Sequence, residues 1–303
     1  MIQAIHWDVT PEIIDGWSTP NFYGLLFVTG LMIGYFVIRK MFLKENISEK
    51  SLDTLVLYMI GATIIGARLG HVFFYGPYWD QYNEFGMLIE EGYLSHPANI
   101  FKVWEGGLAS HGGAIAILIA LYIYSKKVSH KPYLWILDRI AAPVAVAGIF
   151  IRLGNLMNSE IVGKITDVPW AFKFIYRDCM PGGECVWEQI PPRHPAQLYE
   201  SIAYLIIFII LLVLYWKRDA WKKQGMVFGT FLILLFGARF IIEFFKVAQA
   251  TGRDDWMLNT GQLLSVPFVL VGVYLLWRSQ KPEAYMAGIG ANVVDEEKKS
   301  EEI

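Results

Sequence analysis

The sequence predicts an all-α polytopic membrane protein, with seven transmembrane helices and a small irregular extracytoplasmic cap. Hydrophobic residues make up 55% of the 303 positions and charged residues only 18%. The mean hydropathy is +0.39, well above the average of soluble proteins. Apolar runs close to the roughly 20 residues needed to cross a bilayer recur along the chain. The net charge of −2 and the lack of long basic runs argue against nucleic-acid binding.

Each apolar run is interpreted as one membrane span. The spans are expected at residues 22–38, 52–75, 108–124, 133–150, 198–216, 225–245 and 262–277. Residues 1–20 contain no Lys or Arg, and no cleavage site of small residues follows the first run. A secretory signal peptide would have a basic N-terminal region and such a cleavage site, so we expect the first helix to be retained as a true span.

Short loops rich in Lys and Arg indicate which side of the membrane each loop occupies, because such loops stay in the cytoplasm. We expect the N-terminus outside, the C-terminus inside, and segments 76–107, 151–197 and 246–261 on the outer side. The basic residues that decide this follow the first, third and fifth spans: Arg39, Lys40, Lys44, Lys50, Lys126, Lys127, Lys131, Lys217, Arg218, Lys222 and Lys223.

The segments between and after the spans differ in composition. Segment 76–107 is rich in aromatic and acidic residues and is expected to lie along the interface as a short amphipathic helix. The Pro- and Gly-rich stretch 164–193 is expected to form the cap. Its Cys179 and Cys185 are either a local disulfide or two unrelated thiols. Residues 1–277 would form the membrane domain, and residues 278–303 a disordered cytoplasmic tail.

A polar cluster ends the fourth apolar run, in residues 151–163. Arg152, Asn155, Asn158 and Glu160 follow one another at offsets of three, three and two. If the helix continues, Arg152 and Asn155 share a face. An ionisable group at this depth is costly, which favours a ligand or partner for Arg152. The alternative is a helix-capping loop at the membrane surface.

Two further clusters lie at the predicted outer ends of helices. His111, flanked by glycines, is either a proton acceptor or a satisfied core residue. Arg239 and Glu243 are at i and i+4, so Glu243 can neutralise or orient the guanidinium, or the pair can serve packing alone.

Near the fifth span, the run 193–200 contains His194 just before a proline. These residues either support a site or anchor the helix at the interface, with Gln197, Tyr199 and Glu200 joining helices.

The stretch 151–163 resembles the signature of bacterial prolipoprotein diacylglyceryl transferases, Gly-Arg-x-Gly-Asn-Phe-x-Asn-x-Glu-x-x-Gly. Every polar position matches, while Ile151 replaces the first Gly and Leu156 the Phe. The family's other motifs are similar to residues 104–107, 111–113, 193–200, 239–245 and 258–267 of this chain. Tyr23-Gly24 and residues 66–72, which include Arg68, also match, so the resemblance covers about residues 22–267 in family order.

The resemblance implies transfer of a diacylglyceryl group from phosphatidylglycerol to the lipobox cysteine thiol of a prolipoprotein, with release of glycerol 1-phosphate. It places the protein in the bacterial cytoplasmic (inner) membrane, with the site facing outward. We expect Arg152 and Arg239 to hold the phosphate, because guanidinium groups bind phosphate bidentately. His111 is expected to take the thiol proton.

Supporting roles in substrate binding are assigned to the remaining polar residues of the matched motifs. They are Asn155, Asn158, Glu160, Tyr23, Glu243, Arg68 and His194. We expect no metal and no cofactor, because the sequence has neither a His-Glu-x-x-His helix nor carboxylates at ligand spacing.

Other classes of membrane protein would need different residues. A protein that binds or transports anionic lipids would also need outward arginines, but it would form no covalent product. A retinal protein needs a lysine in its last helix, and residues 262–277 contain none. A serine intramembrane protease needs a Gly-x-Ser-Gly motif, which is absent from the sequence.

Overall fold

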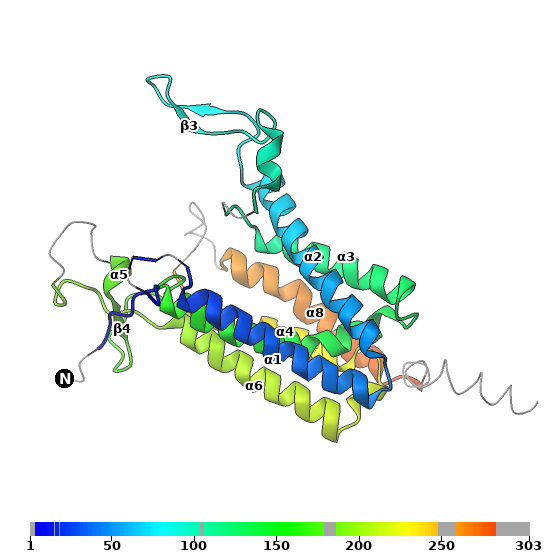
Figure 1. Cartoon of the computed structure of the whole chain (residues 1–303). Coiled ribbons are helices and arrows are strands. Elements are labelled where there is room, and N and C mark those ends of the chain that lie inside the picture. Colours follow the sequence, from blue (N-terminus) through cyan, green and yellow to red (C-terminus); the bar gives the residue numbers. More distant parts are fainter. Residues whose placement is uncertain are drawn as a thin grey trace, which may run out of the picture. The chain divides into compact units, whose positions relative to one another are not determined.

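The computed structural model describes residues 4–14, 16–17, 19–103, 106–178, 186–247 and 258–282. Long helices dominate these residues (Figure 1). Cys179, Cys185 and the predicted tail beyond residue 282 lie outside the described residues. The long helices are α1 (Phe22–Lys44), α2 (Glu49–Phe74), α3 (Ser110–Lys127), α4 (Tyr133–Met157), α6 (Ala196–Lys217), α7 (Met226–Ile242) and α8 (Thr260–Ser279).

Six helices in the described part of the chain are long and apolar enough to cross a membrane. These are α1, α2, α4, α6, α7 with its 3-10 extension, and α8. Helix α3 is expected from the sequence as a seventh span, but it falls short of this criterion. It has 18 residues, and its ends are polar, with Ser110 and His111 at one end and Lys126 and Lys127 at the other.

The helices also run past the apolar residues that predicted them. Helix α1 continues to Lys44 and α4 continues to Met157, so both extend beyond the predicted limits of 38 and 150. The extension of α4 carries Arg152 and Asn155 on the helix itself. The capping-loop alternative therefore applies only to the residues after Met157.

By its contacts the chain divides into two compact units: residues 1–41 with 137–303, and residues 42–136. In the first unit α4 is the most enclosed span, with 61% of its apolar window buried. Helices α7 and α8 approach closely where Gly229 meets Gly272, because a Cβ on Gly229 would lie 2.9 Å from the Gly272 carbonyl oxygen. Asp138 caps the start of α7 by accepting hydrogen bonds from the Gly225 and Phe228 amides at 2.8 Å.

The cap includes the N-terminal arm, which was not expected. Strand β1 (Ile5–Trp7) pairs in parallel with β4 (Phe172–Phe174), which leads into the short helix α5 (Ile175–Asp178). Phe172 and Phe174 form a buried cluster with Leu156 and Val162, and Trp7 packs against it. The cap therefore has a small sheet and core of its own and rests on the end of α4.

In the second unit, α2 and α3 pack against each other through glycines. A Cβ on Gly66 would lie 2.6 Å from the Gly112 carbonyl oxygen, and one on Gly70 would lie 2.7 Å from the Gly112 Cα. After α2 the chain forms a hairpin of β2 (Gln81–Tyr82) and β3 (Leu88–Glu90), then the 3-10 turn η1 (Pro97–Phe101). The amphipathic helix expected in segment 76–107 is wrong. A turn at Asn83–Gly86, with Gly86 at φ 74°, returns the chain as a second strand.

Candidate functional site

The predicted cluster at the end of α4 forms a continuous polar network. The Arg152 Nη1 donates to Asn155 Oδ1 at 3.1 Å, and Asn155 Nδ2 donates to Glu160 Oε1 at 2.8 Å. Asn158 Nδ2 donates to the same oxygen at 3.2 Å. Ser159, just before Glu160, has a φ of 52°, in the left-handed region that non-glycine residues rarely adopt. This turn returns Glu160 toward Asn155, and the Glu160 amide donates to the Asn155 carbonyl oxygen at 3.0 Å.

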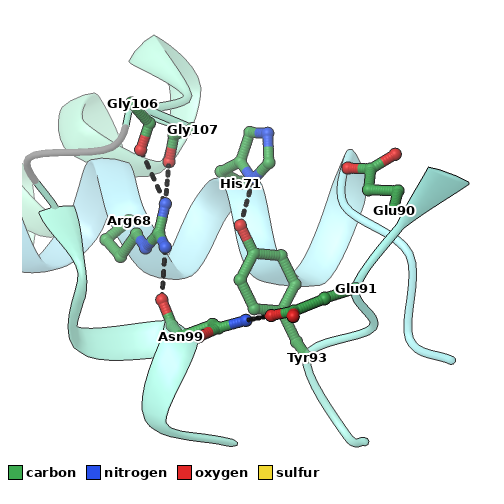
Figure 2. A pocket seen from close by; sticks show the side chains of 8 residues that line it. All are labelled: Arg68, His71, Glu90, Glu91, Tyr93, Asn99, Gly106 and Gly107. Atoms are coloured by element: carbon green, nitrogen blue, oxygen red, sulfur yellow. Dashed lines mark hydrogen bonds between the residues drawn. The ribbon is translucent and has the colours of Figure 1, made fainter. Parts of the chain in front are cut away.

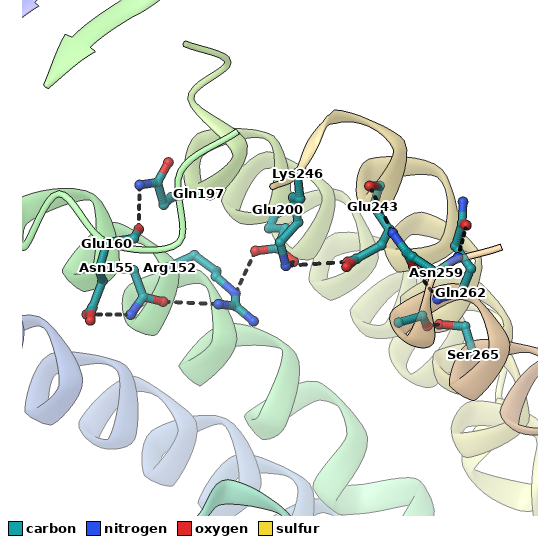
Figure 3. A network of polar contacts seen from close by, with 11 residues as sticks. Arg152, Asn155, Glu160, Gln197, Glu200, Glu243, Lys246, Asn259, Gln262 and Ser265 are labelled. Atoms are coloured by element: carbon teal, nitrogen blue, oxygen red, sulfur yellow. Dashed lines mark hydrogen bonds and ion pairs between the residues drawn. The ribbon is translucent and has the colours of Figure 1, made fainter. Parts of the chain in front are cut away.

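A glutamate on α6 forms an ion pair with Arg152. Glu200 is 1% exposed, and its Oε2 lies 2.9 Å from the Arg152 Nε as an ion pair (Figure 3). Tyr204, one turn further along α6, lies near Arg152 and interacts with it electrostatically. Gln197 Nε2, on the same helix, donates to the Glu160 carbonyl oxygen at 2.6 Å. Helices α4 and α6 therefore hold the guanidinium from two sides.

A buried lysine extends the network toward α7. Lys246 is 4% exposed, and its Nζ lies 3.5 Å from Glu200 Oε1 and 3.5 Å from Glu243 Oε2. Gly261 lies against the Glu243 carboxylate, where a Cβ would be 2.8 Å from Oε1. Glycine at this position of the matched 258–267 motif therefore makes room for Glu243.

The predicted i, i+4 pairing of Glu243 with Arg239 is not formed. Helix α7 ends at Ile242, and the Glu243 amide still donates to the Arg239 carbonyl oxygen. Glu243 begins the 3-10 turn η4 (Glu243–Phe245), and in such a turn the residue at i+3, here Lys246, comes beside it. Glu243 pairs with Lys246 instead. The Arg239 side chain makes no hydrogen bond or ion pair with the described residues, although its charge acts on Tyr204. Its guanidinium therefore keeps donors for another group.

Tyr23 lies against the backbone of α4. A Cβ on Gly154 would be 2.7 Å from Tyr23 Cδ2, so glycine at this position admits the ring. The electrostatic influence of both Arg152 and Glu160 reaches the Tyr23 hydroxyl. Tyr23 therefore lies beside the network around Arg152.

His194 occupies the start of α6, next to the network. Its Nδ1 lies 3.0 Å from the Tyr199 hydroxyl, which accepts a hydrogen bond from the indole nitrogen of Trp170 at 2.8 Å. Partial burial lowers the pKa of His194, which favours the neutral imidazole. The His194 carbonyl accepts a hydrogen bond from the Gly163 amide at 2.9 Å, and this contact ties the 151–163 stretch to α6.

His111 lies in the second unit, exposed in the first turn of α3. Its Nδ1 is 3.4 Å from the Tyr75 hydroxyl, and the two rings stack with centroids 6.0 Å apart. The Tyr75 ring also stacks on His71. His111 is therefore oriented by an aromatic neighbour and keeps an accessible imidazole.

A polar cavity of about 330 Å³ lies beside Arg68 in the same unit (Figure 2). Four backbone carbonyls accept hydrogen bonds from the Arg68 guanidinium, those of Asn99, Ile100, Gly106 and Gly107. Tyr93 stacks on the guanidinium and places its hydroxyl 3.2 Å from His71 Nδ1. The donors of Arg68 are thus used to hold the loop before α3, which indicates a structural role where the sequence suggested substrate binding.

The structure therefore gathers most of the predicted residues in the first unit and places Arg68 and His111 in the second. Three residues were not predicted as partners of Arg152 or Glu243: Glu200, Tyr204 and Lys246. The matched motif 193–200 contained Glu200, but its spacing gave no sign of which cation it meets. In the described residues, no three His, Cys, Asp or Glu side chains are grouped so that they could hold a metal ion.

Comparisons with known proteins agree with the motif matches. A family model described as "Prolipoprotein diacylglyceryl transferase" matches residues 14–278. A phosphatidylglycerol–prolipoprotein diacylglyceryl transferase of Chloroherpeton thalassium is 45% identical, over 91% of this chain and 95% of that protein. Proteins of the same name from Porphyromonas gingivalis and Tolumonas auensis are 43% and 41% identical, over 91% and 92% of this chain and 95% and 99% of their own lengths.

Proposed function

Because the chain belongs to the prolipoprotein diacylglyceryl transferase family, we propose that it transfers diacylglyceryl from phosphatidylglycerol to a prolipoprotein. The acceptor is the thiol of the lipobox cysteine, the product is a thioether, and glycerol 1-phosphate is released. The observation that carries this proposal is the 45% identity over nearly the whole chain. The polar network around Arg152 supports it.

The reaction is a displacement at carbon. The cysteine sulfur attacks the glycerol carbon that bears the phosphate ester, a C–S bond forms, and the C–O bond breaks with its electron pair going to the phosphate oxygen. A free thiol has a pKa near 8.5, so a proton acceptor is required. We assign this role to His111, whose imidazole is exposed and oriented by Tyr75.

We assign phosphate recognition to Arg239 and Arg152, which differ in how their side chains are held. The Arg239 guanidinium, which has no hydrogen-bond or ion-pair partner among the described residues, is offered to the phosphate. Arg152 is held by Glu200 and Asn155, so its geometry is set before the lipid arrives. Charge-assisted bonds from such groups would stabilise the phosphate as it departs.

The headgroup hydroxyls are assigned to the rest of the network. Asn155, Asn158 and Glu160 form one hydrogen-bonded set with both donors and acceptors. Tyr23 and His194 border this set, and Glu243 stands beside Lys246 at its far end.

The setting in the membrane is also part of the proposal. We propose seven spans, with α3 as the additional one: its 18 residues are about 27 Å long at 1.5 Å per residue. The basic turns support an N-terminus outside and a site on the extracytoplasmic side of a bacterial inner membrane, with residues 1–277 as the catalytic domain and 278–303 in the cytoplasm.

A reconstituted assay tests the activity. The purified protein is mixed with phosphatidylglycerol and a synthetic lipobox peptide, and mass spectrometry follows the diacylglyceryl adduct while released glycerol phosphate is assayed. We expect an adduct with the wild type and with Lys127→Ala, which removes an exposed lysine at the end of α3. Arg152→Ala and Arg239→Ala should abolish it. Lipid binding without an adduct for any peptide would favour the lipid-binding or transport alternative.

Two substitutions test the assigned roles. Arg152→Lys keeps the charge but loses the planar fork of donors, so full activity in this variant would contradict a bidentate contact at position 152. His111→Gln removes the proton acceptor. An unchanged rate from neutral to alkaline pH would exclude His111 as the base.

A further inference from the structure

We propose that Lys246 is a positioning residue, which orients Arg152 through Glu200 and keeps Glu243 from pairing with Arg239. The inference rests on the proposed function, because it concerns the two arginines assigned to the phosphate. It starts from an unusual burial: a lysine that is 4% exposed, near a helix end, between two glutamates that are themselves 1% and 6% exposed.

The first step concerns Glu200. Its Oε2 lies 2.9 Å from Arg152 Nε, but the direction does not meet hydrogen-bond geometry. Among the described residues, the hydrogen bond that its side chain accepts comes from Lys246 Nζ, at 3.5 Å from Oε1. Charge alone attracts Glu200 to Arg152, so the orientation of its carboxylate depends on Lys246.

The second step concerns the balance of buried charge. Arg152 and Lys246 carry two positive charges, and Glu200 and Glu243 carry two negative charges, all connected by contacts of 3.5 Å or less (Figure 3). Removing one member leaves a buried charge uncompensated, which is far more costly than the pair was worth. A remaining glutamate would then seek another cation.

Arg239 is the cation that Glu243 would meet. Arg239 lies four residues before Glu243, a separation that puts side chains within reach of each other on a helix. In the native structure Glu243 faces Lys246 and Arg239 stays unpaired among the described residues. Without Lys246, we expect Glu243 to turn to Arg239 and to compete with phosphate for its donors.

The test compares Lys246→Met, Lys246→Arg, Glu243→Gln and the double variant Lys246→Met/Glu243→Gln. The methionine fills the space of the lysine stem without its charge. We expect Lys246→Met to raise the KM for phosphatidylglycerol about tenfold while kcat changes less than about threefold. Lys246→Arg keeps the positive charge, so its KM should stay within about threefold of the wild-type value. A structural role alone would not require this charge.

The double variant separates positioning from folding. Glu243→Gln removes the carboxylate that would capture Arg239 and restores the balance of buried charge. Its KM should therefore lie closer to wild type than that of Lys246→Met. The coupling free energy, calculated from the double variant and the two single variants, should have the opposite sign to the effect of Lys246→Met. A wild-type KM in Lys246→Met, or a double variant as impaired as the single one, would overturn the proposal.

A binding measurement keeps this test apart from the test of the proposed function. Affinity for phosphatidylglycerol is measured in nanodiscs of phosphatidylcholine, with thermal melting as the folding control. A wild-type protein that binds phosphatidylglycerol without making the thioether would contradict the proposed function only. Equal affinity in folded wild type and Lys246→Met would contradict the role of Lys246 only.

Discussion

Asn155 gives the sharpest test of the network, because it joins two charged groups and is 6% exposed. The change Asn155→Ala removes the acceptor for Arg152 Nη1 and the donor to Glu160 Oε1, at 3.1 and 2.8 Å. A hydrogen bond to a charged group is worth about 1.5–3 kcal/mol. The two together amount to at least roughly 3 kcal/mol, and since about 1.4 kcal/mol is tenfold, kcat/KM should fall by about 100-fold or more.

The matched control for Asn155→Ala is Asn158→Ala. Asn158 contributes one longer hydrogen bond, 3.2 Å to the same Glu160 oxygen, and is only partly buried. We expect a loss of about tenfold in kcat/KM for this variant. Both rates come from the mass of the peptide adduct over time, with melting temperature measured in parallel. An Asn155→Ala protein that is folded and within threefold of wild type would refute the assignment of this network to the substrate.

Three further predictions concern other parts of the chain. Gly154→Ala would place a Cβ 2.7 Å from the Tyr23 ring, so transfer activity should fall at least about tenfold; Gly61→Ala, which meets nothing within 4 Å, should leave the rate unchanged. The lysine of Arg68→Lys cannot reach four carbonyls, so we expect a lower melting temperature with little change in the KM for phosphatidylglycerol. A higher KM with an unchanged melting temperature would instead support a substrate role for Arg68. Burial lowers the pKa of His194 below 6.5, which stabilises the fold above that pH and is lost as the pH falls. Melting temperatures should therefore drop more steeply below about pH 6.5 in wild type than in His194→Gln, and parallel curves would exclude the effect.

Much of the fold could be predicted from the sequence. Long apolar runs predict helices because only a helix satisfies its own backbone hydrogen bonds in hydrocarbon. Each of the predicted runs contains a long helix. The polar residues near the end of α4 were recognisable as a candidate site, since ionisable groups at such a position are costly without a partner.

The composition of the network could be predicted only in part. Asn155 and Glu160 are near Arg152 in sequence, so helical spacing was sufficient to bring them together. Glu200 is 48 residues beyond Arg152, and its contact depends on how α6 packs against α4. No local pattern predicts that packing, so the sequence left Glu200 either as support for a site or as a residue that joins helices, without naming its partner.

The sequence by itself therefore determined the helices, the family motifs and the chemical types at the site. Tertiary structure decided which charges meet. Helical spacing favoured a pair between Glu243 and Arg239, but Glu243 pairs with Lys246, which also contacts Glu200 of α6. The physical reason is that ion pairing depends on side-chain direction over a few ångströms, and this direction is set by how a helix ends and what packs beside it, not by the order of residues along it.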